Sequence, residues 1–330
     1  MLYRRFGHTP VQVSALGLHT QHFGTLNSRK DALALLSGAE ERGLTYIDVA
    51  GADGLTSFGR AGGAEPIVGA WLAQAPNRRE QVVLSATVFG EMGYGPSADT
   101  ILRACEASLR RLRTDHIDLL ILHRLDRGTA WDEVLEATDR LTRAGKIGHL
   151  GSSHLAGWHL ATFNQEASKH DLPGFVSEEC AYSLLRRSFE LEVLPACRAF
   201  GMAVITSSPL ADGLLDGVLN ASPGRPVDPD MRRAVAALRP QLQAWEALCH
   251  DVGHAPAAVA LAWLLHNPRV TASLIGPRTL AELDTAVRAF DVDWSAELAE
   301  CLDRIFPGPV REAPDAFWPI PGIQLAPSIA

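Results

Sequence analysis

Short apolar segments alternate with amphipathic segments along nearly the whole of this 330-residue chain. This alternation is typical of repeated βα units whose strands form a parallel sheet. Eight strands are expected, and with helices between them they suit a closed barrel better than an open doubly wound sheet. No GxGxxG sequence follows an early strand, so a Rossmann fingerprint is absent. The expected strands cover residues 14–18, 45–49, 81–86, 117–123, 149–152, 175–178, 203–206 and 272–275.

Between the strands, apolar residues recur at three- and four-residue spacing, which predicts helices over residues 31–42, 98–112, 130–143 and 257–265. Residues 3–13 are expected to form a hairpin that plugs the barrel floor. Residues 217–230 are rich in turn-forming types and predict a long loop. The tail from Phe306 contains six prolines and should be extended, in a position to fold over the barrel mouth. The predicted fold is one (β/α)8 TIM barrel domain over residues 1–330, with an N-terminal hairpin and a C-terminal extended tail.

Composition excludes several classes of partner. The chain is 47% hydrophobic, yet no apolar run reaches the roughly 18 residues that a membrane span needs, and no signal-peptide core follows Met1. A net charge of −8 without a basic run argues against nucleic acid and anionic membranes. The five scattered cysteines lack CxxC spacing and predict reduced thiols. We therefore expect a cytoplasmic protein that binds a small molecule, as a monomer or a homodimer.

Several segments together resemble the aldo-keto reductases over essentially the whole chain. They are Tyr3-Arg4-Arg5-Phe6-Gly7, Gly43-Leu44-Thr45-Tyr46-Ile47-Asp48, Ile117-Asp118-Leu119-Leu120-Ile121-Leu122-His123, Gly145-Lys146-Ile147-Gly148, Ser208-Pro209-Leu210 and Ile275-Gly276-Pro277-Arg278. Each match is weak alone, but their order and spacing are specific. The resemblance implies a (β/α)8 barrel and NADPH-dependent carbonyl reduction.

In that family a Tyr is the general acid, a Lys and an Asp lower its pKa, and a His orients the carbonyl. Asp48 and His123 match this set, whereas the Tyr position holds Asp53 and the Lys position holds Thr87. An unperturbed Asp ionises near pH 4 and accepts protons at neutral pH. Tyr94 is the one tyrosine placed to act as a substitute acid.

The positions that the resemblance assigns to the cofactor are also altered. Ser153 matches a carboxamide contact, but His154 and Glu179 stand where the family has Asn and Gln, and Ser207 replaces the aromatic residue that stacks on the nicotinamide. Losing these contacts should cost several kcal/mol of binding. The phosphate cradle, in contrast, is retained in Ser208, Leu210, Gly213 and Arg278. We therefore expect that no cofactor is required, while NADP binding stays possible.

Ionisable side chains replace the missing groups at the carboxyl ends of the strands, where (β/α)8 barrels place their chemistry. Such a set suits acid–base chemistry. Simpler interpretations stay open: Asp48 and His123 as inherited scaffold, His19 as a core histidine, and a bare salt bridge between His154 and Glu179. No metal site is predicted, because no diagnostic ligand spacing is present. The candidate catalytic residues are His19, His22, Asp48, Asp53, Tyr94, His123, His154 and Glu179.

Three functions follow from this set. The favoured hypothesis is an enzyme with a divergent active site that acts on a small oxygenated metabolite, of sugar or polyketide type and from secondary metabolism. It would use acid–base chemistry without hydride transfer, as a lyase, dehydratase, epimerase or cyclase. The first alternative is an NADP-dependent carbonyl or sugar reductase with a non-standard acid such as Tyr94 or His123. The second alternative is an inactive ligand- or partner-binding pseudoenzyme. Fold alone does not decide between them.

Overall fold

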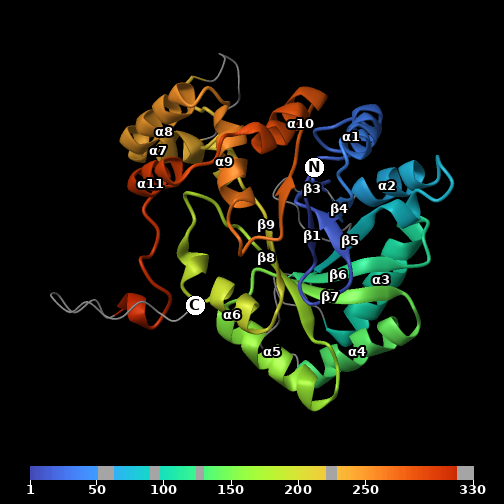
Figure 1. Ribbon diagram of the computed structural model, residues 1–330. Helices are drawn as coiled ribbons and strands as arrows, with labels where there is room; N and C mark the ends of the chain where they lie inside the picture. Colours follow the sequence, from blue (N-terminus) through green and yellow to red (C-terminus); the bar gives the residue numbers. More distant parts are fainter. Residues whose placement is uncertain (51–62, 90–96, 124–129, 221–228, 318–330) are drawn as a thin grey trace.

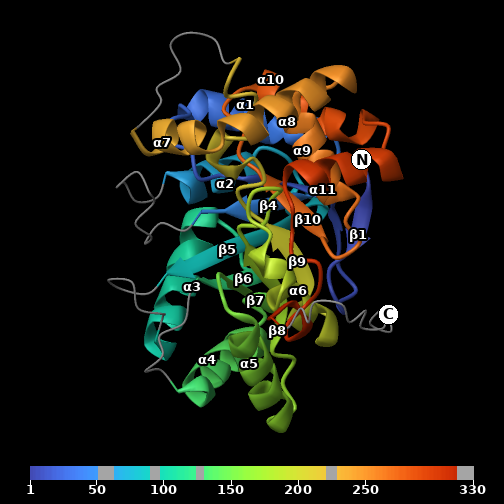
Figure 2. The ribbon, with the colours of Figure 1, turned by 90° about the vertical axis from the view of Figure 1, so that its left-hand side faces the viewer.

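A closed barrel of eight parallel strands forms the centre of the molecule, with helices around it (Figures 1 and 2). The computed structural model describes residues 1–50, 63–89, 97–123, 130–220 and 229–317. The strands follow one another around the barrel in chain order, and the last pairs with the first. The predicted (β/α)8 fold is therefore confirmed. The barrel strands are β3 (Leu16–His19), β4 (Tyr46–Val49), β5 (Val83–Phe89), β6 (Ile117–His123), β7 (Ile147–Ser153), β8 (Phe175–Cys180), β9 (Ala203–Thr206) and β10 (Ala272–Ile275).

The N-terminal hairpin covers the barrel floor as expected. Strands β1 (Tyr3–Arg5) and β2 (Gln12–Ser14) pair antiparallel. Phe6, at the start of the turn between them, is buried and packs edge-on against Tyr46 with ring centroids 6.0 Å apart. Burial of these two rings fills the lower part of the barrel, so the open space for chemistry lies at the opposite, carboxyl end of the strands.

The helices begin where the sequence supplies capping groups. The hydroxyls of Ser28, Ser97 and Thr279 accept hydrogen bonds from N–H groups in the first turns of their helices. Pro256 takes the first position of the buried helix Pro256–Leu265. The helices are α1 (Arg29–Glu41), α2 (Ala64–Leu72), α3 (Ala98–Leu112), α4 (Trp131–Arg143), α5 (Gly157–Lys169), α6 (Val193–Ala199), α7 (Pro229–Ala237), α8 (Arg239–Asp251), α9 (Pro256–Leu265), α10 (Leu280–Val287) and α11 (Ala296–Ile305).

Strand β5 differs most from its predicted bounds, since it runs over Val83–Phe89 rather than 81–86. Strand β8 continues to Cys180 rather than ending at Glu178. Alternation along this longer strand brings Glu179 onto the inner face and leaves Glu178 on the outer face. The predicted loop over 217–230 overlaps residues 221–228, which lie outside the described residues, and its last two residues open α7.

The described part of the C-terminal tail lies against the outside of the barrel near α6. The Ala313 N–H donates to the Leu191 carbonyl, and Glu312 pairs with Arg198 at 2.9 Å. Residues 318–330 lie outside the described residues, so the expected cover over the mouth stays a prediction.

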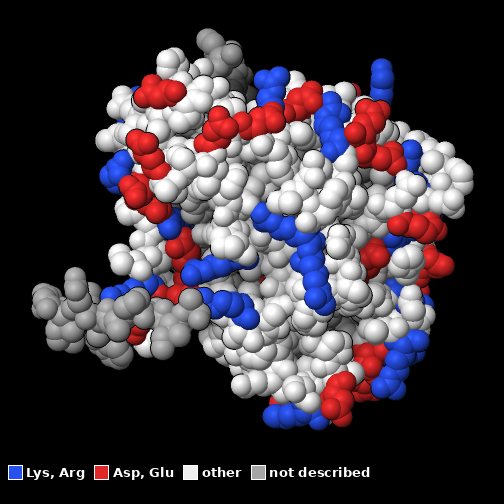
Figure 3. Space-filling view, in the orientation of Figure 1, with Lys and Arg blue, Asp and Glu red and all other residues white. Residues whose placement is uncertain are grey.

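The charged surface and the lengths of the helices agree with the composition. Acidic and basic side chains are mixed over the face shown in Figure 3. Within the described residues, no single helix is long and apolar enough to cross a membrane. Helices α8 and α9 reach the necessary length and apolar character only as a pair, with a bend of 88° between them. The five cysteines are unpaired thiols, four of them buried.

Candidate active site

Three neighbouring strands bring His19, Asp48 and Ser85 together at the carboxyl end of the barrel. The register pairs His19 with Asp48 and Asp48 with Ser85, so the three side chains lie at one level. His19 Nδ1 is 2.5 Å from Asp48 Oδ2, and the Ser85 hydroxyl donates to Asp48 Oδ1. Asp48 is 1% exposed, whereas the His19 side chain is 23% exposed. The buried carboxylate therefore holds an imidazole that reaches the mouth.

This contact sets the charge of His19. Burial lowers its pKa, but the hydrogen bond and the charge of Asp48 outweigh burial, and Glu179 and Gln21 add to them, so the pKa of His19 is raised above 6.5. A hydrogen bond from Nδ1 to a buried carboxylate favours the protonated form of the imidazole. In the resembled family a Lys lies beside this Asp, and here His19 contacts it from the neighbouring strand on the other side.

Glu179 faces the same interior from β8. Burial, followed by the charge of Asp48, raises the pKa of Glu179 to about 7, against the opposing influence of His19 and a hydrogen bond from Ser207. Burial and the neighbouring Asp48 therefore favour the neutral form of this carboxyl more than in an ordinary glutamate. Tyr46 lies two residues before Asp48 on the same face and is completely buried, which raises its pKa well above 10. Its phenol stays neutral.

A second cluster forms at the ends of β6 and β7. His123 Nδ1 lies 3.3 Å from the Ser153 hydroxyl, and the rings of His123 and His154 meet edge to face with centroids 5.0 Å apart. His154 adopts the left-handed conformation (φ 60°), and its N–H donates to the backbone carbonyl of Glu179. This backbone contact links the two residues that stand at the altered carboxamide positions.

Glu178 points away from the mouth, as strand alternation predicts. Its carboxyl accepts hydrogen bonds from the Ser152 hydroxyl (2.6 Å) and the Leu155 N–H (2.8 Å). Complete burial raises the pKa of Glu178 to about 8 in spite of these bonds. It is part of the framework behind β7 and β8 rather than of the cavity.

His22 lies on the other side of the mouth, next to the end of β10. Its Nε2 is 3.4 Å from the Gln21 amide, and both side chains approach Gly276. Burial lowers the pKa of His22, and the neighbouring charges of His19 and Arg278 lower it further. The pKa of His22 is therefore shifted in the opposite direction from that of His19.

The predicted phosphate cradle is a compact turn after β9. Ser208 and Gly213 have positive φ values of 47° and 97°, and the Gly213 N–H donates to the Leu210 carbonyl. The Ser208 hydroxyl contacts Asp212, whose carboxylate is paired with Arg186 at 2.6 Å. On the neighbouring strand end, Arg278 pairs with Glu282 at 2.9 Å and keeps 45% of its side chain exposed.

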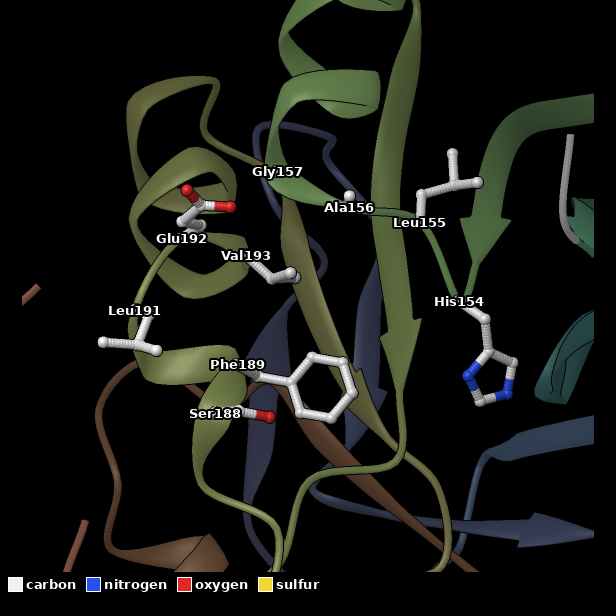
Figure 4. Close-up of a pocket in the computed structure, with 9 residues that line it drawn as sticks. All are labelled: His154, Leu155, Ala156, Gly157, Ser188, Phe189, Leu191, Glu192 and Val193. Carbon is white, nitrogen blue, oxygen red and sulfur yellow. The ribbon is translucent and has the colours of Figure 1, made fainter. Parts of the chain in front are cut away.

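A pocket of about 380 Å³ lies at the rim beside His154 (Figure 4). One wall is the turn from His154 to Gly157, and the other is the segment around Phe189, whose ring points toward the His154 side. Most of its lining is apolar. The lining residues are His154, Leu155, Ala156, Gly157, Ser188, Phe189, Leu191, Glu192 and Val193.

Two predicted candidates, Asp53 and Tyr94, lie outside the described residues. Sequence reasoning overlooked Ser85 and Tyr46. Ser85 and Tyr46 could have been found by counting two residues back from Thr87 and from Asp48, because side chains two apart on a strand share a face.

Comparisons with known proteins identify the family. The model of the aldo/keto reductase family matches residues 15–306. The chain belongs to the aldo/keto reductase family. It is 40% identical to an uncharacterized oxidoreductase, YrpG, of Bacillus subtilis, over 96% of this chain and 99% of that protein. It is 31% identical to the protein tas of Escherichia coli (92% and 97%) and 30% identical to the norsolorinic acid reductase stcV of Emericella nidulans (87% and 76%).

These relatives overturn two expectations. The favoured hypothesis of acid–base chemistry without hydride transfer is wrong, because relatives across the full barrel are named oxidoreductases and reductases. The expectation that no cofactor is required is wrong for the same reason, since the family implies NAD(P)H. A replaced side chain at a cofactor position does not always mean a lost hydrogen bond. A buried carboxyl with a pKa of about 7, as at Glu179, can donate and accept hydrogen bonds much as an amide does.

Proposed function

We propose that this protein is an NAD(P)H-dependent oxidoreductase that reduces the carbonyl group of a small oxygenated molecule. The observation that carries the proposal is the His123–Ser153 contact at 3.3 Å, at the carboxyl ends of two adjacent barrel strands. This is the edge at which (β/α)8 enzymes perform their chemistry. An imidazole there can hydrogen-bond a carbonyl oxygen and orient it.

The donor set fits a nicotinamide dinucleotide. A carboxamide needs both acceptors and donors; the buried Ser153 hydroxyl offers both, and so does the Glu179 carboxyl when it carries a proton, which its raised pKa favours. At the other end, the turn of Ser208, Leu210 and Gly213 and the Arg278 guanidinium would hold the phosphates. When bound, the reduced nicotinamide supplies a hydride to the carbonyl carbon.

The remaining residues position the substrate. His123 would bind the carbonyl oxygen, and the rings of His123 and His154 form one side of the space above Ser153. The rim pocket beside His154 would take the rest of the substrate, and its apolar lining with the Phe189 ring favours a flat, apolar group over a free sugar. The relative named norsolorinic acid reductase supports reduction as the reaction of this site.

The test is a titration with NADPH and with NADH, followed through the fluorescence of the protein's tryptophans, combined with a turnover assay. We expect saturable binding of at least one nucleotide and its oxidation in the presence of 4-nitrobenzaldehyde as a simple aromatic carbonyl. His123→Ala should retain nucleotide binding and lose most of the turnover. Failure of both nucleotides to bind, or binding without oxidation by any member of an aldehyde and ketone panel, would refute the proposal.

A further inference from the structure

His19 is held in the barrel mouth by a buried carboxylate. Its Nδ1 lies 2.5 Å from Asp48 Oδ2, and the Ser85 hydroxyl donates to the other oxygen of Asp48. Asp48 is 1% exposed, while 23% of the His19 side chain is exposed. Because Nδ1–H donates to Asp48, the mobile proton of this imidazole is the one on Nε2.

We propose that His19 is the proton donor for carbonyl reduction and that Asp48 is its positioning residue. This inference rests on the proposed function. The C=O double bond is reduced to a C–H bond and an O–H bond: the carbon takes the hydride of the reduced nicotinamide, and the oxygen takes the proton of His19 Nε2. The nicotinamide is left oxidised, and the neutral imidazole stays on Asp48 until water returns the proton.

The charged and titratable groups around His19 favour this role. Asp48 faces it from β4 and Glu179 from β8, and both carboxyls raise the pKa of His19, as does the hydrogen bond with Gln21; burial alone lowers it. His22, from the following turn, carries a lowered pKa and adds little positive charge. An imidazole with a pKa near or above the working pH is an effective general acid.

The other groups at this level are less suited to give a proton. The resemblance assigns Asp53 and Thr87 to the family's Tyr and Lys positions; an unperturbed Asp is ionised at neutral pH, and Thr is not a titratable residue. The Tyr46 phenol is completely buried, and burial raises its pKa well above 10.

The experiment compares wild type with His19→Gln, Asp48→Asn and, as a control, His116→Gln, whose side chain is 41% exposed before β6. The kcat of wild type, measured with 4-nitrobenzaldehyde at NADPH concentrations that saturate the protein at every pH, should fall as the pH rises through the pKa of His19. His19→Gln should lose about 100-fold in kcat and the alkaline fall with it, with the Kd for NADPH within twofold. Asp48→Asn should move the fall to lower pH, and His116→Gln should match wild type.

A second readout does not depend on turnover. The imidazole signals of ¹⁵N-labelled protein without nucleotide should give a pKa for His19 above 6.5, and a lower one in Asp48→Asn. A wild type that neither binds nor oxidises NADPH overturns both proposals. Wild-type activity whose alkaline fall survives in His19→Gln, or a His19 signal unaffected by Asp48→Asn, overturns this inference and leaves the proposed function standing.

Discussion

Glu178 provides the sharpest prediction about stability, because a completely buried carboxyl is costly to ionise. The perturbation is Glu178→Gln. In the native protein the Leu155 N–H donates to Oε1, and Oε2 lies 2.6 Å from the Ser152 hydroxyl, which is also 3.1 Å from the Ser177 carbonyl. When Glu178 is protonated, Oε2–H can donate to Ser152, and Ser152 can donate to Ser177. A glutamine amide can reproduce all three bonds.

The magnitude follows from the pKa of about 8 against an ordinary value of 4.5. Between these two pKa values the folded state holds a proton that the unfolded state has released, so the free energy of unfolding falls as the pH rises from 4.5 and levels off above 8, where Glu178 is ionised in both states. At 1.36 kcal/mol per pKa unit, full ionisation costs about 5 kcal/mol, and about 3 kcal/mol of this cost is already present at pH 7.

The assay is urea unfolding followed by tryptophan fluorescence at pH 5, 7 and 8. Wild type and Glu178→Gln should agree to within about 1 kcal/mol at pH 5, and the variant should be more stable by about 3 kcal/mol at pH 7. The exposed Glu136 on α4 supplies the control, and Glu136→Gln should keep the wild-type pH dependence. A Glu178→Gln protein that is less stable than wild type at pH 7, or that keeps its pH slope, would refute the argument.

Three further predictions concern the cavity and the floor. The wild-type Kd for NADH should rise about tenfold from pH 6 to pH 8, because the Glu179 carboxyl, with its pKa of about 7, loses its proton over this range. In Glu179→Gln the Kd should become nearly independent of pH. A wild-type Kd that does not change with pH would contradict this prediction. Phe189→Ala should raise KM for flat aromatic ketones about tenfold and leave KM for acetone unchanged, while Trp158→Ala, 57% exposed on α5, should alter neither. Phe6→Ala should lower the free energy of unfolding by about 3–4 kcal/mol, since Phe6 is 2% exposed, and a loss below about 1 kcal/mol would show that the hairpin does not close the floor.

Local patterns predicted much of the scaffold. The strands Ile117–His123, Ala203–Thr206 and Ala272–Ile275 were predicted to the residue, because each is a short apolar run bounded by polar or turn-forming residues. The end of β8 was missed because Glu178 and Glu179 look like a polar strand end in sequence. Only pairing with β7 and β9 on both sides keeps two glutamates inside a strand.

The residues that make up the site can be found from local sequence, whereas the chemistry of the site depends on tertiary contacts. Strand order and two-residue alternation are local properties, so the sequence alone indicates which side chains can reach the mouth. The resemblance to the family also assigned Asp53 and Thr87 to its Tyr and Lys positions. The tertiary structure decided that His19 pairs with Asp48, which depends on the register between β3 and β4. It also decided the proton content of Glu178 and Glu179, because the pKa of a carboxyl depends on burial and neighbouring charge, and both arise only when distant segments pack together.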